Sequence, residues 1–141
     1  MRQGPLLEFV GYHVRLAQLY VYADFMRGQP EPTMTPGQLA ILILVHENPG
    51  MTQRVLGERM GVDKSTLTVA LDRLTRRKWL RRVRSREDRR SNVLELTAQG
   101  VRQMRRMIAF VRRHERRMMT SLSARERREL VRLLGKLRSP G

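Results

Sequence analysis

The chain of 141 residues is long enough for one domain with helical extensions and a buried core, and its formal net charge is +16. It contains no cysteine, which excludes a disulfide framework, a thiolate metal site and a thiol redox sensor. No apolar run approaches the roughly 20 residues needed to cross a bilayer, and no signal-peptide pattern follows Met1. We therefore expect a cytoplasmic protein without a membrane partner.

The positive charge is concentrated after the first third of the chain. Residues 1–51 have a net charge of −1, whereas residues 52–141 hold 26 basic and 9 acidic side chains, a net of +17. Of the 29 basic residues 26 are arginine, which suits bidentate contacts with phosphate and guanine. A GC-rich genome also explains the preference for arginine, but not its uneven distribution. The charge pattern predicts a polyanionic partner for the second segment.

The first predicted element is a helix over residues 6–26. Its apolar side chains cover nearly every face, and such a helix has to be covered on several sides. In a small protein this indicates a partner subunit. Residues 28–32, which include two prolines and a glycine, are predicted to form a linker.

Two helices with clear end signals are predicted next. The Thr-Pro-Gly-Gln sequence at 35–38 starts the first as a capping box, and the helix ends at Asn48, before Pro and Gly. The second covers about 53–60, with Thr52 as its cap and Gly61 in the left-handed conformation that closes it.

A further helix over about 64–77 is predicted to be capped by Asp63. Leu67, Leu71 and Leu74 are spaced at i, i+4 and i+7, which gives this helix a buried seam. Two short helices joined by a glycine-containing turn form a helix-turn-helix, in which the second helix enters the major groove of DNA.

The outward face of this recognition helix offers contacts to DNA. Ser65 and Thr66 lie near its N-terminus, where hydroxyl and amide groups meet phosphates. Arg73 is the candidate for bidentate contact with guanine, and Val69 for packing on a thymine methyl group. An ordinary solvated amphipathic helix is the alternative. The predicted DNA-contacting residues are Lys64, Ser65, Thr66, Thr68, Val69 and Arg73.

A β-hairpin is predicted over about 80–97. Leucine and β-branched residues suit its strands, whereas its tip is too highly charged to be core. Arginine at such a tip suits the negative potential of a narrow minor groove, and Asp88 is expected to pair with an arginine and hold the tip. A merely soluble loop is the alternative. The predicted DNA-contacting residues of this wing are Arg86, Asp88, Arg89 and Arg90.

Two amphipathic helices complete the chain. Thr97 caps a basic helix over about 98–119, and a capping box at 123–126 begins the last helix. Together with the first helix they predict a homodimer whose two heads lie about one DNA turn apart on a pseudo-palindrome. An intramolecular bundle is the alternative. The apolar stripe of the last helix comprises Leu130, Val131, Leu133, Leu134 and Leu137.

No catalytic constellation stands out. His13, His46 and His114 are scattered, and no HExxH, glycine-rich phosphate loop or G-x-S-x-G sequence is present. We expect neither an enzyme nor a cofactor, and a metal site at His13, His46 and Glu47 lacks support.

Side chains with polar ends on the otherwise apolar first helix indicate a ligand pocket. Arg15 or His13 would meet the carboxylate of an aromatic anion in a cleft between the dimerisation helices and the head. Core packing with satisfied polar tips explains the same pattern equally well. The predicted pocket residues are Tyr12, His13, Arg15, Tyr20 and His46.

From about Leu6 to Leu137 the chain resembles the MarR family of bacterial winged-helix regulators. The most specific part is an Asp-x-Arg wing at 88–90 followed by Leu-Thr-x-x-Gly at 96–100, after the helix segment 65–74. The resemblance implies minor-groove reading by the motif arginine, Arg90, with Asp88 as its orienting partner. It implies a mainly α fold with a small β-wing, in which a winged helix-turn-helix is flanked by N- and C-terminal dimerisation helices. The expected segments are 1–33 (N-terminal dimerisation helix and linker), 34–97 (winged helix-turn-helix) and 98–141 (C-terminal dimerisation helices).

The resemblance also implies a function. Members are homodimeric regulators, and many respond to phenolic or aromatic carboxylates or to aromatic acyl-CoA thioesters. We expect a repressor of this kind, and the alternative is a constitutive architectural DNA-binding protein without an effector. The family often has a polar or basic residue at the position of Val69 and glycine at that of Lys78. The base preference and the end of the recognition helix therefore stay open.

Overall fold

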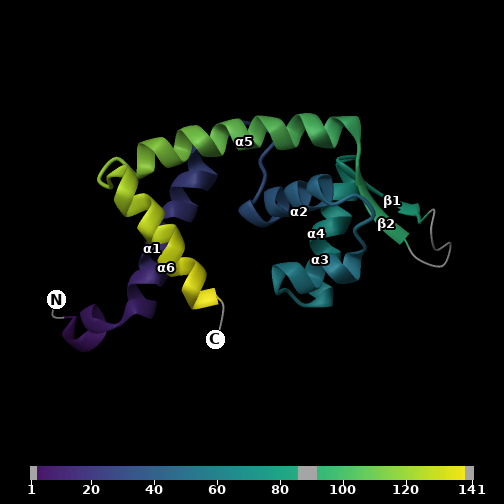
Figure 1. Cartoon of the computed structure of the whole chain (residues 1–141). Helices are drawn as coiled ribbons and strands as arrows, with labels where there is room; N and C mark the ends of the chain where they lie inside the picture. The colour runs from purple at the N-terminus through teal and green to yellow at the C-terminus, as the bar shows by residue number, and fades with distance from the viewer. Residues whose placement is uncertain (1–2, 86–91, 139–141) are drawn as a thin grey trace. The chain divides into compact units, whose positions relative to one another are not determined.

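The computed structural model describes residues 3–85 and 92–138 and divides the chain into two compact units (Figure 1). Residues 29–109 form the head unit, and residues 1–28 together with 110–141 form the terminal unit. The boundary at residue 109 falls inside a long helix, α5 (Ala98–Met118), which therefore contributes to both units. The assignment of dimerisation roles to particular segments stays a prediction.

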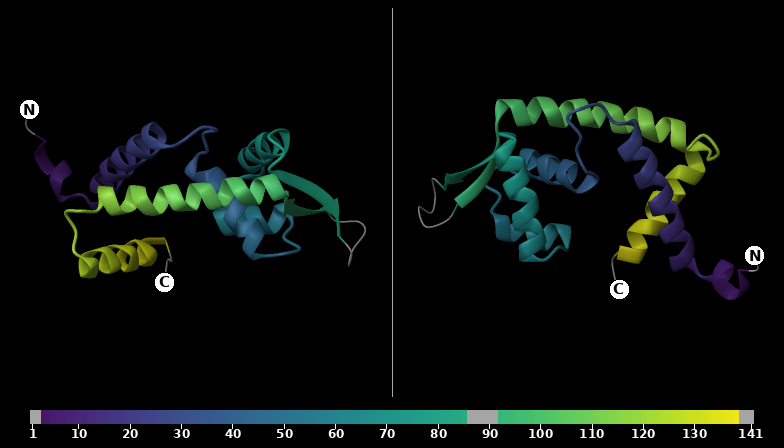
Figure 2. Two further views of the ribbon diagram at one scale, coloured as in Figure 1. Left: turned by 90° about the horizontal axis from the view of Figure 1, so that it is seen from above. Right: turned by 180° about the vertical axis from the view of Figure 1, so that it is seen from behind.

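The head unit contains three helices and then a two-stranded antiparallel sheet, which the first part of α5 follows in the chain. The strands extend away from the helices as a wing (Figure 2). This confirms the predicted mainly α fold with a helix-turn-helix and a small β-wing. The bounds are α2 (Pro36–Glu47), α3 (Gln53–Met60), α4 (Lys64–Arg76), β1 (Leu80–Arg84) and β2 (Asn92–Leu96).

The predicted helix starts of the head unit are confirmed by their hydrogen bonds. The Gln38 amide N–H donates to Thr35 Oγ1 at 3.2 Å, and the Thr35 amide N–H donates to Gln38 Oε1 at 3.0 Å. The Val55 amide N–H donates to Thr52 Oγ1 at 3.4 Å. Gly61 ends α3 at a φ of +63°, a conformation that glycine adopts without a Cβ clash.

The core of the head unit lies between the helices and the inner side of the wing. Leu71 and Leu74 are fully buried and Leu67 is 2% exposed, which confirms the predicted seam of α4. Trp79, which directly follows the turn after α4, is the largest fully buried side chain. Other core residues are Leu42, Val45, Leu56, Leu80, Leu94, Met104 and Met107.

Gly100 lets the start of α5 pass directly against the turn after α4. A Cβ at Gly100 would lie 1.9 Å from the carbonyl oxygen of Trp79, which no side chain can tolerate. Thr97 ties the same two segments together, because its hydroxyl donates to the Lys78 carbonyl at 2.6 Å and accepts from the Gly100 N–H at 3.0 Å. The Leu-Thr-x-x-Gly sequence thus joins the wing, the turn and α5.

The terminal unit begins differently from the prediction. Residues Gly4–Glu8 form a short 3-10 helix, η1, and α1 covers Val10–Gly28. The predicted continuous helix from residue 6 is wrong because Phe9 is extended, with φ −93° and ψ 114°. Its carbonyl accepts the first hydrogen bonds of α1, from the amides of Tyr12 and His13. The apolar pattern runs through this break and therefore gives no sign of it.

Aromatic rings and one buried histidine hold α1 against the end of α5. The ring centroids of Phe25 and Phe110 are 5.4 Å apart, and that of His114 lies 5.7 Å from Phe25. His114 is 4% exposed, its Nε2 lies 3.0 Å from Asp24 Oδ2, and Arg117 pairs with the same carboxylate. These contacts give His114 a packing role within the terminal unit.

The last helix, α6 (Ala124–Arg138), starts at the predicted capping box. The Glu126 amide N–H donates to Ser123 Oγ at 3.2 Å, and the Ser123 amide N–H donates to Glu126 Oε2 at 2.7 Å. None of its described residues is buried. Seen from above, α1 and α6 lie on opposite sides of the end of α5 (Figure 2, left), so neither covers the other.

Residues 3–85 and 92–138 hold neither a membrane-spanning helix nor a cluster of metal-ligating side chains. No helix there is long and apolar enough to cross a membrane. No group of three or more His, Asp or Glu side chains there is placed to hold a metal ion.

Candidate nucleic-acid interface

The exposed face of α4 carries the residues predicted to contact DNA. Val69 and Arg73 are exposed on the side opposite the buried leucine seam, and Lys64 is exposed in the first turn of the helix. Within the described part of the chain, the side chains of Lys64 and Arg73 have no hydrogen-bond or ion-pair partner. Two cationic groups are therefore free to meet an anionic or hydrogen-bond-accepting surface.

An acidic cap holds the first hydroxyl side chains of α4. Asp63 Oδ1 accepts from the Thr66 amide at 2.9 Å and from Ser65 Oγ at 2.5 Å, and Oδ2 accepts from Thr66 Oγ1 at 2.7 Å. The hydrogen bond from the Ser65 hydroxyl, followed by those from Thr66, lowers the pKa of Asp63 well below its ordinary range. The predicted cap is confirmed. Because both hydroxyl protons serve Asp63, the predicted phosphate contacts of Ser65 and Thr66 require these hydroxyls to turn toward the phosphate.

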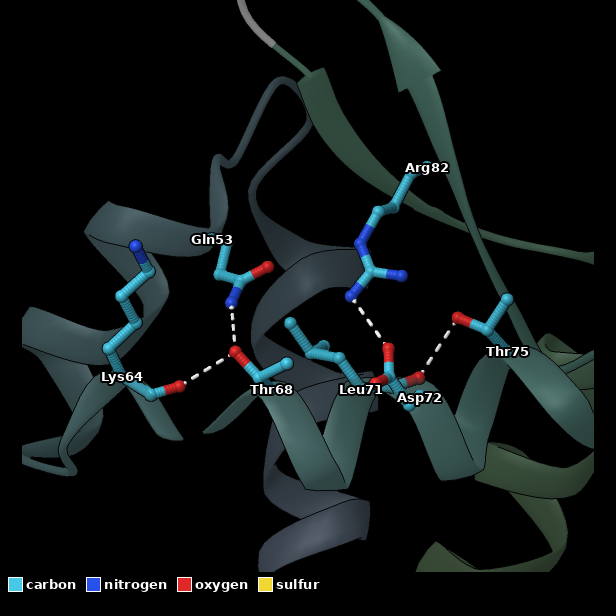
Figure 3. Close-up of polar contacts among 7 residues, drawn as sticks. All are labelled: Gln53, Lys64, Thr68, Leu71, Asp72, Thr75 and Arg82. Carbon is cyan, nitrogen blue, oxygen red and sulfur yellow. Dashed lines mark hydrogen bonds and ion pairs between the residues drawn. The ribbon is translucent and has the colours of Figure 1, made fainter. Parts of the chain in front are cut away.

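Thr68 is held by a contact between the two helices of the helix-turn-helix. Gln53 Nε2 donates to Thr68 Oγ1 at 2.9 Å, and the Thr68 hydroxyl donates to the Lys64 carbonyl at 2.8 Å (Figure 3). Thr68 is one of the residues predicted to contact DNA. Its one proton is committed, and one lone pair of its oxygen remains to accept a hydrogen bond.

The wing is tied to the recognition helix by an ion pair. Arg82 Nη2 on β1 lies 3.1 Å from Asp72 Oδ1 on α4 (Figure 3). The two side chains are 34% and 51% exposed, so water screens the pair and its contribution to stability is small. The pair joins β1 directly to α4, which are the elements predicted to enter neighbouring grooves.

The recognition helix α4 is terminated by a residue with a left-handed backbone conformation. Lys78 has a φ of +58°, its amide N–H donates to the Thr75 carbonyl at 2.9 Å, and the Trp79 amide N–H donates to the Leu74 carbonyl at 3.0 Å. This is the Schellman pattern, with Trp79 and Leu74 both buried beneath it. Lys78 thus adopts the backbone conformation that glycine often supplies at this position in the family that the chain resembles. The helix itself ends at Arg76.

The wing strands confirm the predicted hairpin, but its tip lies outside the described residues. The antiparallel register pairs Leu80 with Leu96 and Val83 with Val93. Arg81 Nη2 pairs with Glu95 Oε2 across the strands at 2.9 Å. The predicted minor-groove residues Arg86, Asp88, Arg89 and Arg90 fall in the segment 86–91, which the structure does not describe.

The residues predicted for an effector pocket are distributed over both units. His13 Nε2 lies 2.9 Å from the Leu7 carbonyl and its ring meets Tyr12 edge-on, while Arg15 donates to Gln18 Oε1 at 3.0 Å. Tyr20 is 67% exposed. His46 is exposed at the end of α2 in the head unit, so the pocket stays a prediction.

The head unit has a cavity of its own beside α4, with a volume of about 500 Å³. None of the predicted pocket residues lines it. Its walls include Thr35, Gln38, Ile41, Met60, Val62, Ser65, Thr66, Leu67, Val69, Ala70 and Arg73.

Three interface residues were not found from the sequence. Gln53 and Arg82 contact residues of α4 although they lie on other elements, and no role was predicted for Asp72. Each contact joins residues 10 or more positions apart, which helical periodicity does not reveal. The one available signal was the placement of opposite charges on adjacent predicted elements.

Comparison with known proteins places this arrangement in one family. A MarR family model matches residues 33–91, which include all three helices of the helix-turn-helix region and β1. A protein of Thauera aromatica, named as a transcriptional regulatory protein for the hcr operon, is 30% identical over 135 residues. The match covers 95% of this chain and 81% of that protein.

Solved structures agree along nearly the whole length. The transcriptional repressor CouR, bound to a 23-mer DNA duplex, is 32% identical with a TM-score of 0.90 over 99% of both chains. CouR bound to p-coumaroyl-CoA is 30% identical with a TM-score of 0.88 over 100% of this chain and 99% of that one. The transcriptional regulator PcaV of Streptomyces coelicolor, in complex with its natural ligand, is 32% identical with a TM-score of 0.85 over 97% and 96%. The chain therefore belongs to the MarR family of winged-helix, DNA-binding transcriptional regulators.

Proposed function

We propose that this regulator is a homodimeric repressor that reads a pseudo-palindromic operator. α4 enters the major groove of each half-site and the wing reaches the adjacent minor groove. The observation that carries this proposal is the exposed surface of α4, where the side chains of Lys64 and Arg73 have no described partner while the leucine seam of the same helix is buried. The likeness to CouR bound to a DNA duplex supports it.

Exposed apolar side chains support the dimer. In a single copy of the chain, α1 with its leading turn and α6 leave many large apolar residues exposed, a surface that a partner normally covers. We assign that partner to a second copy, since the unpaired faces belong to helices at both ends of one chain. The exposed residues are Leu6, Leu7, Phe9, Val10, Val14, Leu16, Leu19, Tyr20, Tyr22, Leu130, Val131, Leu133, Leu134 and Leu137.

The DNA-contacting residues have separable roles. Arg73→Ala is expected to relax the preference for guanine at one position, at a cost of about 1–3 kcal/mol. Arg90→Ala is expected to weaken binding through loss of the minor-groove contact. Fluorescence anisotropy on duplexes that differ at single base pairs measures both effects. A variant lacking Arg73 with an unchanged base preference would remove that assignment.

The decisive test is whether binding depends on sequence. Selection from a random duplex library should enrich a pseudo-palindrome that the protein prefers by ~10³-fold or more over random DNA at a fixed salt concentration. An architectural protein would show a steep salt dependence without such a preference. Binding to all duplexes alike would therefore overturn the regulator proposal in favour of the architectural one.

The effector belongs to the same proposal. We assign a small aromatic carboxylate or its CoA thioester, held near Tyr12, His13, Arg15, Tyr20 and His46, which lowers operator affinity by binding better to a DNA-incompatible conformation. The p-coumaroyl-CoA complex of CouR and the ligand complex of PcaV support this class of compound. The test titrates p-coumaroyl-CoA, p-coumarate and CoA alone into the preformed protein–operator complex. CoA alone should leave the complex intact, and if neither aromatic compound releases DNA, the assignment fails for both.

A further inference from the structure

One apolar side chain is out of place on the surface of the head unit. Among the described residues of 29–109, Val69 is the one large apolar side chain that the structure leaves exposed, at 52%. The other exposed large apolar residues all belong to the terminal unit, where the proposed dimer would cover them. Val69 therefore needs a separate explanation.

Its position on α4 supplies one. A helix turns by about 100° per residue, so Val69 lies about 200° around from Leu67, on the side opposite the buried seam. Lys64 and Arg73 share the exposed surface of this helix. In the proposed complex, Val69 thus lies on the side of α4 that faces into the major groove.

The neighbouring hydroxyl does not supply a competing hydrogen-bond donor. The proton of Thr68 is committed to the Lys64 carbonyl, and its oxygen already accepts from Gln53. Thr68 therefore cannot donate to the acceptors that purines and thymine present in the major groove. The remaining lone pair of Thr68 Oγ1 can accept only from the amino groups of adenine or cytosine, so recognition of thymine at this level of the helix is left to an apolar contact.

The chemistry of the groove offers one apolar group. Of the four bases only thymine carries a methyl group at C5, which projects into the major groove. Valine is restricted at χ1 in a helix, so its two methyl groups are already held in place before DNA binds. We propose that Val69 is a specificity-determining residue that packs on the C5-methyl group of a thymine in each half-site; this rests on the proposed function.

The experiment removes that methyl group from DNA alone. Each thymine of the selected duplex is replaced in turn by deoxyuridine, and affinity for the full-length protein is measured by fluorescence anisotropy. We expect one thymine in each half-site at which the loss weakens binding about fourfold, the effect of burying one methyl group. Replacing the same base pair by 5-methyl-dC paired with dG should give tighter binding than unmodified dC paired with dG.

Protein variants identify the side chain responsible. Val69→Ala should bind the thymine and deoxyuridine duplexes equally, whereas Thr68→Ser, which keeps the hydroxyl and its bonds, should retain the difference. The salt dependence of Val69→Ala should match that of the natural protein, because no phosphate contact is lost. Val69 is exposed, so its truncation leaves the fold intact.

Two failures can be told apart. If selection enriches no duplex, the proposed sequence-specific function fails and this inference fails with it. If a duplex is enriched but no thymine is sensitive, or if Val69→Ala keeps the sensitivity, only the assignment of Val69 is overturned.

Discussion

Lys78 occupies the left-handed backbone region at the turn between the recognition helix and the wing. Among the described residues it is the one residue other than glycine with a positive φ. A Cβ in this conformation costs roughly 1–2 kcal/mol, which glycine avoids, although glycine loses more entropy on folding. The Schellman hydrogen bonds and the burial of Trp79 therefore hold Lys78 in a conformation that it does not prefer.

Lys78→Gly should stabilise the protein. We expect the free energy of unfolding to rise by no more than about 1 kcal/mol, the steric relief less the added entropy of the unfolded chain. Urea unfolding at a fixed protein concentration measures it. Arg76→Gly, two residues earlier and inside the helix, is the matched control and should be destabilising by a similar amount. Equal effects of the two substitutions would contradict the strain at Lys78.

Asp63 makes the start of α4 sensitive to acid. Its pKa is lowered by hydrogen bonds from Ser65 and Thr66, so the cap contributes stability above the unfolded pKa of about 3.9 and loses it as the pH falls toward the folded value. Asn at this position caps a helix but does not titrate. The difference in unfolding free energy between the natural protein and Asp63→Asn should therefore shrink below about pH 4. A difference that is the same at neutral and acidic pH would contradict this assignment.

At the scale of elements, the recognition helix α4 and the wing strand β1 are joined by a side-chain contact and by a backbone turn. The pair between Asp72 and Arg82 joins α4 to β1, and the Schellman turn joins the same two elements through the backbone. The backbone turn sets the connection, and we propose that the ion pair helps to hold the angle of the wing. Its value lies in positioning rather than in stability.

Neutralising Asp72 tests this role, because the two explanations of Asp72 predict opposite changes in operator affinity. If Asp72 were merely an acidic group near DNA, Asp72→Asn would relieve repulsion and strengthen binding. A positioning role predicts operator binding that is weaker by roughly fivefold, the equivalent of a surface pair worth about 1 kcal/mol. Glu95→Gln is the control, since Glu95 pairs with Arg81 within the wing and leaves α4 untouched. Tighter binding by Asp72→Asn would rule the positioning role out.

At the scale of the whole molecule, positive charge is not confined to the head unit. The head unit carries 16 basic and 8 acidic side chains, and the terminal unit carries 13 and 5, so each has a net charge of +8. The proposed DNA contact by α4 and the wing accounts for the positive charge of the head unit. The positive charge of the terminal unit lies on the part of the chain proposed to form the dimer, where two like-charged copies repel each other.

Added salt should therefore have opposite effects on dimerisation and on DNA binding. Raising the ionic strength from about 0.05 M to about 0.5 M screens the repulsion between subunits and should strengthen the dimer. The same change should weaken DNA binding, because releasing the counterions condensed on DNA gains less free energy in more concentrated salt. Sedimentation velocity and anisotropy measure the two equilibria. A dimer that weakens with added salt would show that ion pairs, rather than apolar contacts, hold it together.

The apolar surface of α6 is expected to carry the dimer. Val131 is 72% exposed in the single chain, and Val131→Glu should place a charge in the interface and weaken dimerisation by at least about tenfold. Lys136→Glu, on the same helix, changes the charge without removing an apolar contact and should leave the protein dimeric. Light scattering coupled to gel filtration distinguishes them. A dimeric Val131→Glu variant would move the interface elsewhere.

Local signals in the sequence determined most of the secondary structure and the family. The caps at Thr35, Asp63 and Ser123 and the leucine seam of α4 were predictable because each depends on residues within one or two helical turns. The hairpin was predictable from strand-forming residues on either side of a charged tip. Short-range hydrogen bonds and periodic burial leave a mark that can be read from neighbouring residues alone.

The tertiary structure alone decided how these elements act together. The contact of Gln53 with Thr68, the pair of Asp72 with Arg82 and the approach of Gly100 to Trp79 join residues that are far apart in sequence. Their geometry depends on how two elements pack, and no local pattern encodes it. The break at Phe9 was hidden for a related reason, because an apolar run looks the same whether its backbone is helical or extended.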